Sequence, residues 1–206
     1  MNKIYSIIRE QEYKKISNLS IDGRILDIGG SKKSGYHELI KGKHSIVTAN
    51  IDSSFGCDVV FDIQYNFPLD DESFDAVISL NVFEHVFYYN KSLTESFRVL
   101  KTGGKFVAAV PFMHQIHGSP DDFFRFTESA IKKLLLDVGF TSYQIEKIGL
   151  GIFSLNFQLL GGVLPSIFRV IIKNLCIYID KFLLMIPKYN KFCERIPLGY
   201  FIVAVK

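Results

Sequence analysis

The feature that most constrains the fold is a regular alternation of apolar runs with turns and helical segments. Strands are predicted at residues 25–28, 45–51, 58–63, 74–80 and 105–110, with closing strands at 143–148 and 199–205. The inner runs are apolar along their length and do not alternate with polar residues, which is typical of a parallel sheet covered on both faces. The chain therefore predicts an α/β fold built on a doubly wound sheet.

Helical segments with recognisable ends lie before and between these strands. Ser92 and Glu95 form the pattern of a capping box, in which two side chains close the first turn of a helix. Thr127 can cap a second helix, which we expect to end before Gly139. Residues 1–22 have isoleucines at helical spacing and lack the apolar run of a secretory signal, so a short amphipathic helix is expected there.

The chain of 206 residues is long enough for one domain. We expect residues 1–206 to form that domain, with a core at 24–148, an insertion at 149–198 and a last strand at 199–206. The 24 basic and 21 acidic side chains give a net charge of +3, which argues against nucleic-acid binding through a strong basic field. The three cysteines are far apart, which favours a reducing, cytoplasmic location.

The insertion is strongly apolar in a chain with 19 Phe, 10 Tyr and no Trp. Residues 148–168 carry no charge, and residues 166–186 suit a helix. On that helix Arg169, Lys173 and Asp180 form one stripe, and the rest of the surface is apolar. Two interpretations are open. The helix covers the sheet or a second copy of the chain, or it lies on a membrane surface and gives access to a lipid-linked substrate.

The candidate ligand site lies at the carboxyl ends of the strands, where open α/β sheets bind their ligands. Gly29 and Gly30 follow the first strand, and adjacent glycines let the backbone turn sharply against a ligand. Asp52 follows the second strand and can accept hydrogen bonds from both hydroxyls of a ribose. Asp62 follows the third strand and can accept from an exocyclic amine, with Ile63 against a purine ring. The pattern predicts an adenosine-containing ligand.

Several segments at these positions resemble those of the class I S-adenosylmethionine-dependent methyltransferases. They are residues 26–30, 50–52, 74–79, 83–86 and 98–105. The most similar branch is the small single-domain type, which has an LEHV helix start and an RVLKPGG turn. The resemblance covers about residues 24–150, with the segments in the expected order.

The resemblance implies a Rossmann-like sheet of seven strands, mostly parallel with the last strand antiparallel, and S-adenosyl-L-methionine as the cofactor. The implied cofactor-binding residues are Asp27, Gly29, Gly30, Ser31, Asp52, Asp62, Ile63 and Asn81. The glycines would face the methionine end, Asp52 the ribose, and Asp62 the adenine. Asn81 would lie near the reactive sulfonium, and Asp27 would organise the first loop.

The first loop departs from the family pattern of glycines at alternate positions. Ser31 and Lys33 stand where the family usually has glycine, so a loop of different shape is expected. The departure leaves an alternative open, in which the chain is a non-catalytic protein that binds S-adenosylmethionine or another adenosine ligand.

The segment after the fifth strand carries the candidate catalytic residues. His114 and His117 lie there among acids and aromatics, and a neutral histidine is a natural proton acceptor near neutral pH. His85, at the helix start after the fourth strand, is a third candidate. These histidines could instead pair with nearby acids, while Arg125 holds the loop shut. His114 and His117 have no third ligand at metal-binding spacing, so no metal is expected.

The acceptor is narrowed by sequences that the chain lacks. No Asn/Asp-Pro-Pro-Tyr sequence, which clamps amines, follows the fourth strand, and no cysteine is placed for attack on a cytosine ring. The expected acceptor is a hydroxyl of a small molecule, a sugar or a lipid-linked compound. The segment with His114, His117 and Arg125 is similar to one in relatives associated with bacterial surface-polysaccharide synthesis.

Overall fold

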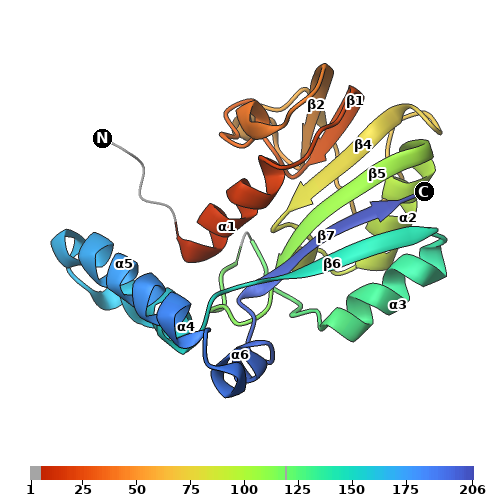
Figure 1. Cartoon of the computed structure of the whole chain (residues 1–206). Helices are drawn as coiled ribbons and strands as arrows, with labels where there is room; N and C mark the ends of the chain where they lie inside the picture. Colours follow the sequence, from red (N-terminus) through yellow and green to blue (C-terminus); the bar gives the residue numbers. More distant parts are fainter. Residues whose placement is uncertain (1–5, 119) are drawn as a thin grey trace.

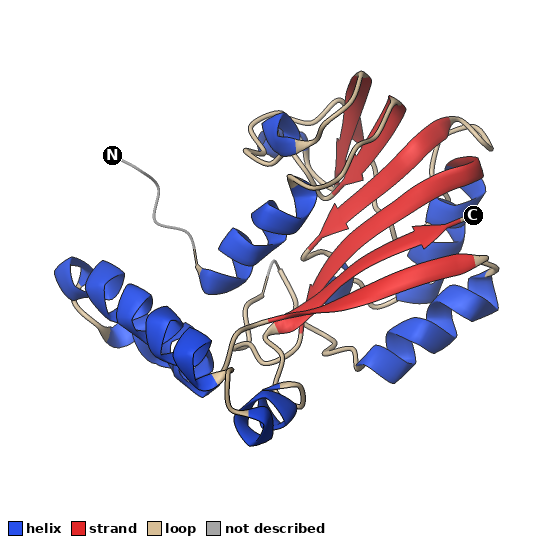
Figure 2. Ribbon diagram, in the orientation of Figure 1, coloured by secondary structure: helices blue, strands red, loops and turns tan. Residues whose placement is uncertain are grey.

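The fold is a seven-stranded sheet with helices on both faces (Figures 1 and 2), seen in a computed structural model that describes residues 6–118 and 120–206. The strands are β1 (Gly23–Ile28), β2 (His44–Asn50), β3 (Val59–Val60), β4 (Phe74–Leu80), β5 (Leu100–Pro111), β6 (Ser142–Ile148) and β7 (Gly199–Val205). Their order in the sheet is β3-β2-β1-β4-β5-β7-β6. β7 runs antiparallel to both of its neighbours, β5 and β6, and the other described strand pairs are parallel. The predicted doubly wound, mostly parallel sheet is confirmed.

The helices are α1 (Ile7–Ile16), α2 (Tyr89–Val99), α3 (Glu128–Val138), α4 (Ile152–Leu160), α5 (Ser166–Leu183) and α6 (Pro187–Cys193). The N-terminal helix is present as α1, while residues 1–5 of its predicted range lie outside the described residues. Thr127 caps α3 as predicted, because its hydroxyl accepts a hydrogen bond from the Ala130 amide at 3.2 Å. Gly139 ends the same helix with a positive φ of 111°.

Two hydrophobic layers hold the helices to the sheet. Successive residues of a strand point to opposite faces, so Leu26 belongs to one layer and Ile25 to the other. The first layer includes side chains of α2 and α3, and the second includes Ile7, Ile8 and Ile16 of α1. The wholly apolar strand pattern thus results from burial on both faces.

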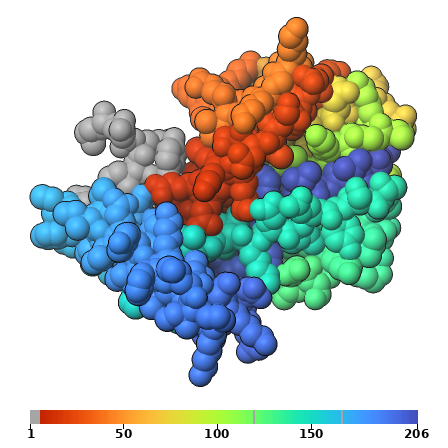
Figure 3. Space-filling view, viewed as in Figure 1, coloured from red at the N-terminus to blue at the C-terminus, as the bar shows by residue number. Residues whose placement is uncertain are grey.

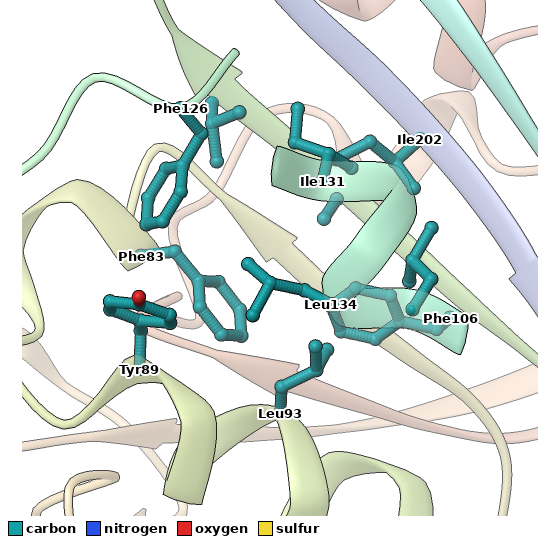
Figure 4. Close-up of a pocket in the computed structure, with 11 residues that line it drawn as sticks. Phe83, Tyr89, Leu93, Phe106, Phe126, Ile131, Leu134 and Ile202 are labelled. Atoms are coloured by element: carbon teal, nitrogen blue, oxygen red, sulfur yellow. The ribbon is translucent and has the colours of Figure 1, made fainter. Parts of the chain in front are cut away.

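A small cavity of about 40 Å³ lies inside the first layer (Figure 4). Tyr89 and Leu93 from α2, Ile131 from α3 and Phe106 from β5 point toward it. The lining has no charged side chain, so this space is a packing feature of the core.

Two sequence expectations about local structure are wrong. Ser92 and Glu95 form no capping box, since both lie inside α2. The Ser92 hydroxyl donates to the Ile63 carbonyl at 2.7 Å, and the Glu95 carboxylate accepts from the Phe67 amide at 2.8 Å. Both side chains therefore fix the turn after β3. That strand is also shorter than predicted, because Asp62 accepts from the Gln64 amide and begins a turn.

The insertion between β6 and β7 folds into α4, α5 and α6, with α4 and α5 side by side at the left of Figure 1. The central helix α5 buries polar side chains and exposes apolar ones, which is the reverse of an ordinary surface helix. Lys173 and Asp180 of the polar stripe are buried, and Lys173 pairs with Glu10 of α1. Asp180 accepts hydrogen bonds from the Ser154 and Phe153 amides at 2.6 and 3.2 Å, which caps the start of α4.

The opposite side of α5 is apolar and exposed. We define the apolar face as Ile167, Phe168, Ile171, Leu175, Tyr178 and Phe182, each more than half exposed. Figure 3 shows that α4, α5 and α6 form a protruding flank of the molecule beside α1. Among the described residues, no helix combines the length and apolar character needed to span a bilayer.

The Thr127 cap predicts a measurable stability difference. Thr127→Ala removes the side-chain acceptor at the start of α3, so the free energy of unfolding should fall by about 1 kcal/mol in urea denaturation. Thr127→Ser keeps the hydroxyl and serves as the control, with a loss well below that of alanine. Equal losses for the two variants would contradict the capping role.

Candidate active site

A cleft lies where the carboxyl ends of β1, β2, β3 and β4 meet. It has a volume of about 270 Å³ and is lined by residues that follow each of these strands, and by the loop after β5. The lining residues are Gly29, Asn50, Ile51, Phe55, Phe61, Asp62, Ile63, Gln64, Asn81, Val82, His85, Val86, Pro120, Asp121 and Phe123. Four of the predicted cofactor residues are among them, namely Gly29, Asp62, Ile63 and Asn81.

Gly30 and Asp27 do not line the cleft, but they fix the shape of the first loop. Asp27 is fully buried, and its carboxylate accepts from the Tyr36 hydroxyl at 2.7 and 2.8 Å and lies 2.6 Å from His37 Nε2. Burial raises the pKa of Asp27, and these hydrogen bonds oppose the rise. A Cβ on Gly30 would lie 1.8 Å from an Asp27 oxygen, so glycine is required there.

Ser31 and Lys33 belong to a loop closed by its own side chains. The Ser31 amide donates to the Ser34 hydroxyl at 3.0 Å, and the Ser31 hydroxyl accepts from the Lys33 amide at 3.3 Å. Lys32 pairs with Asp58 at 2.6 Å, which fastens the loop to the strand beside it. Ser31 itself is not in the cleft lining.

Asp52 lies just outside the cleft lining. It is exposed, and its carboxylate accepts from the Ser54 amide at 2.7 Å, which starts a short turn after β2. Its neighbours Asn50 and Ile51 line the cleft, and Asn50 donates to the Gly30 carbonyl at 3.1 Å. The ribose contact of Asp52 stays a prediction.

Asn81 directly follows β4 and has the left-handed conformation, with a φ of 55°. Its amide nitrogen donates to both carboxylate oxygens of Glu12 at 3.0 and 3.1 Å. Glu12 comes from α1 and is 1% exposed. Burial raises the pKa of Glu12 to about 7, and the hydrogen bond from Asn81 opposes that rise.

The candidate catalytic histidines gather beside the cleft around Glu84. His85 Nε2 and His117 Nε2 lie 3.7 and 3.6 Å from one oxygen of Glu84. Glu84 is fully buried, and neither of its carboxylate oxygens has a hydrogen-bond partner among the described residues. Burial raises the pKa of Glu84 to about 8.

His114 lies next to that cluster and contacts it through the ring of His117. Its ring centroid is 4.7 Å from that of His117, and its Nε2 lies 3.3 Å from the Gln158 amide nitrogen on α4. Burial lowers the pKa of His114, which favours the neutral imidazole. The structure thus brings all three candidate histidines together, although only His85 lines the cleft.

The loop carrying these histidines is held by an ion pair. Arg125 binds Asp122 through two hydrogen bonds of 2.5 and 2.6 Å, and it also donates to the Gln115 carbonyl at 2.9 Å. Asp122 in turn accepts from the His117 amide at 2.8 Å. The expectation that Arg125 holds the loop shut is confirmed.

The comparisons with known proteins concern the fold and one domain match. A family model described as a methyltransferase domain matches residues 39–108. No curated protein matches the chain. Among solved structures, a methyltransferase from Archaeoglobus fulgidus described as SAM-dependent has a TM-score of 0.58 at 20% identity, over 97% of this chain and 92% of that one.

Two further structures have the same fold. A Haloferax volcanii methyltransferase in complex with its Trm112 activator has a TM-score of 0.61 at 16% identity, over 97% of this chain and 88% of that one. The Burkholderia thailandensis 1,6-didemethyltoxoflavin-N1-methyltransferase, which holds S-adenosylhomocysteine, has a TM-score of 0.55 at 15% identity, over 97% and 78%. Residues 39–108 thus match a methyltransferase domain, and the whole chain has the fold of S-adenosylmethionine-dependent methyltransferases.

Similar structures are described as S-adenosylmethionine-dependent or hold S-adenosylhomocysteine, and S-adenosylmethionine would supply a methyl group on a positively charged sulfur. The cleft fits such a molecule, because Asp62 offers an acceptor beside the aromatic rings of Phe55 and Phe61, and Gly29 leaves the backbone accessible. Sequence reasoning missed the two phenylalanines and Glu12. The aromatics carried no motif, and Glu12 reaches Asn81 only through the packing of α1.

Glu12 predicts a pH-dependent stability that a single variant isolates. Its pKa rises from 4.5 when exposed to about 7 in the fold, so its contribution to stability is fully present below pH 4.5 and is lost as the pH rises through 7. Relative to Glu12→Gln, the wild type should lose roughly 2–3 kcal/mol between about pH 5 and about pH 8 in chemical denaturation. Parallel pH profiles for the two proteins would contradict this assignment.

Proposed function

We propose that this methyltransferase transfers the methyl group to a hydroxyl of a small-molecule, sugar or lipid-linked acceptor. The observation that carries the proposal is the cluster of Glu84, His85 and His117 next to the cofactor cleft. A hydroxyl is a weak nucleophile until its proton is withdrawn, so such an acceptor needs groups that activate the oxygen. Three converging acceptor atoms at the cleft provide that environment.

The position of the cluster supports an acceptor bound on the β4 side of the cofactor. Asn81 and His85 both line the cleft and come from the turn after β4, while His117 reaches the same place from the loop after β5. Methyl transfer is a displacement in which alignment of the acceptor oxygen supplies much of the rate. The Arg125–Asp122 pair gives the loop the rigidity that alignment requires.

The turn after β4 also supports oxygen over nitrogen as the acceptor. It reads Asn81-Val82-Phe83-Glu84, without the prolines and tyrosine that clamp an amine. A role in surface-polysaccharide synthesis fits a hydroxyl-rich acceptor and forms part of the proposal.

The proposal predicts both a binding and a product result. Wild-type protein should bind S-adenosylmethionine and S-adenosylhomocysteine in calorimetry, and Asp62→Asn should weaken binding about 10- to 100-fold by removing a charged acceptor. Asp137→Asn, on the exposed side of α3, is the matched control and should bind as the wild type does. Turnover with a panel of sugar and polyprenyl-linked acceptors should give a methyl ether, identified by nuclear magnetic resonance.

The outcomes separate the two functional classes. A methylated nitrogen or carbon in the product would overturn the hydroxyl assignment. Binding of the cofactor without turnover across the acceptor panel would favour the alternative of a non-catalytic adenosine-ligand protein.

We also propose that the apolar face of α5 rests on an anionic membrane surface, with the protein cytoplasmic and peripheral. Lys173 and Asp180 on the polar stripe of α5 make contacts inside the protein. A rotation of α5 that buried its apolar face would break the Lys173–Glu10 pair and the Asp180 hydrogen bonds. A helix with one large exposed apolar face is typical of binding within a lipid interface.

Charge favours lipid over a second copy of the chain. Within the described insertion, the exposed charged side chains are Lys181, Lys188, Lys191, Glu194 and Arg195. Four of these five are basic, so a two-fold dimer through this flank would bring like charges together. Anionic headgroups are complementary to the same charges.

The insertion also contacts the loop that carries the candidate histidines. Gln115 donates to the Leu159 carbonyl near the end of α4, and Gln158 of α4 lies against His114. The start of α4 is capped by Asp180 of α5. A lipid-linked acceptor lying under α5 would therefore have a short route to the cleft.

A sedimentation assay with vesicles tests the membrane proposal. Detergent-free protein should sediment with vesicles that contain phosphatidylglycerol and should bind neutral phosphatidylcholine vesicles more weakly. Leu175→Glu places a charge on the apolar face and should abolish sedimentation, while Asn90→Glu on the exposed side of α2 makes a similar change elsewhere and should not. Recovery of the wild type in the supernatant, or dimerisation through α5 without vesicle binding, would overturn the proposal.

A further inference from the structure

The cluster beside the cleft brings together three atoms that accept hydrogen bonds. The ligand atoms of Glu84, His85 and His117 all lie within 4.8 Å of one another, and the two Nε2 atoms are 3.7 and 3.6 Å from one Glu84 oxygen. These separations are too long for direct hydrogen bonds. Glu84 is fully buried and its carboxylate has no hydrogen-bond partner in the described part of the chain.

The other nitrogen of each ring fixes the direction of its lone pair. His85 Nδ1 lies 2.5 Å from the Asp121 carbonyl oxygen, and His117 Nδ1 lies 3.1 Å from the Gln115 carbonyl oxygen. A carbonyl oxygen only accepts, so each Nδ1 carries the proton and donates it. In the neutral rings both Nε2 atoms are therefore acceptors, and they lie beside a Glu84 oxygen that has no donor among the described residues. An uncompensated arrangement of this kind in a buried site is costly.

A cation between the three atoms removes that cost. Nitrogen and oxygen ligands of zinc lie about 2.0–2.2 Å from the ion, and a tetrahedral arrangement then separates neighbouring ligand atoms by about 3.4 Å. The two separations between a histidine Nε2 and the Glu84 oxygen, 3.7 and 3.6 Å, are close to that value, and the three ligand atoms all lie within 4.8 Å of one another. We propose that Glu84, His85 and His117 bind one divalent metal ion, with zinc the best match to two histidines and a carboxylate.

The surroundings have the organisation of a metal site. Ligating histidines usually donate their second nitrogen to a carbonyl or a carboxylate, and here the two carbonyl contacts provide this. Asp122 Oδ2 also lies 3.5 Å from His117 Nδ1. The sequence-based expectation that no metal binds was based on His114 and His117 as the pair of ligands. The structure instead joins His117 to residues that follow β4.

The metal proposal deepens the proposed function and rests on it for its chemical role. Three protein ligands leave a fourth position open, and His85 lines the cleft that would supply its occupant. An acceptor hydroxyl bound there loses its proton to water more readily. Its oxygen then forms the bond to the methyl carbon as the carbon–sulfur bond breaks, which releases S-adenosylhomocysteine.

Metal titration of the purified, chelator-treated protein tests the site without relying on activity. One equivalent of Zn²⁺ should bind in calorimetry, and Co²⁺ should give the visible absorption of a tetrahedral site. Glu84→Gln and His117→Gln should each weaken binding at least about tenfold, since even loss of an outer-shell partner has that effect. His44→Gln, at the start of β2, is the matched control and should bind as the wild type does.

Binding of S-adenosylhomocysteine by each variant reports that it is folded. Absence of stoichiometric Zn²⁺ binding by the wild type, or equal binding by wild type and His117→Gln, would overturn the metal site. Hydroxyl methylation that persists after complete metal removal would sink the metal's role and leave the proposed function intact. Stoichiometric metal binding with a product methylated on nitrogen would do the reverse.

Discussion

The reversal of strand order beside β1 is the constraint on which the rest of the structure depends. β1 pairs with β2 on one side and with β4 on the other. After β1 the chain continues toward β2 and β3, and after β4 it continues in the opposite direction toward β5. The loops at their carboxyl ends diverge and leave a crevice that side chains do not fill. Gly29, Asp62 and Asn81 come from three separate loops and meet only because of this crevice. The cofactor cleft is thus a consequence of topology before it is a consequence of any one residue.

Helix α1 connects this cleft to the insertion. Glu10 pairs with Lys173 of α5, the Gln11 side chain accepts from the Gly149 amide at 2.9 Å, and Glu12 accepts from Asn81. Consecutive helical residues point about 100° apart, so three neighbours can reach three different partners. The same short helix therefore fixes where the insertion begins and supports the wall of the cleft. Loss of α1 would loosen both together.

The strands and the cleft could be predicted from the sequence because their signals are local. Apolar runs mark β1, β4 and β5. In any parallel arrangement, the residues just after these strands lie together at the carboxyl ends of the strands. Long-range contacts of particular side chains were not predictable in this way. Ser92 and Glu95 fit a capping box in sequence, yet both bind the turn after β3. Glu84 and His117 are likewise far apart in the chain, and no spacing rule brings them together.

The orientation of α5 shows a second limit of sequence patterns. Periodicity correctly separates the stripe containing Lys173 and Asp180 from the apolar remainder, but it does not say which side faces the protein. The decision lies with Asp180, which caps α4 and accepts from the Tyr189 hydroxyl, and with Glu10 on α1. Burial of a large apolar side chain contributes about 1.5–3 kcal/mol, so the exposed apolar face forgoes several such contributions. The proposed membrane contact would cover these side chains with an apolar phase and offset that loss.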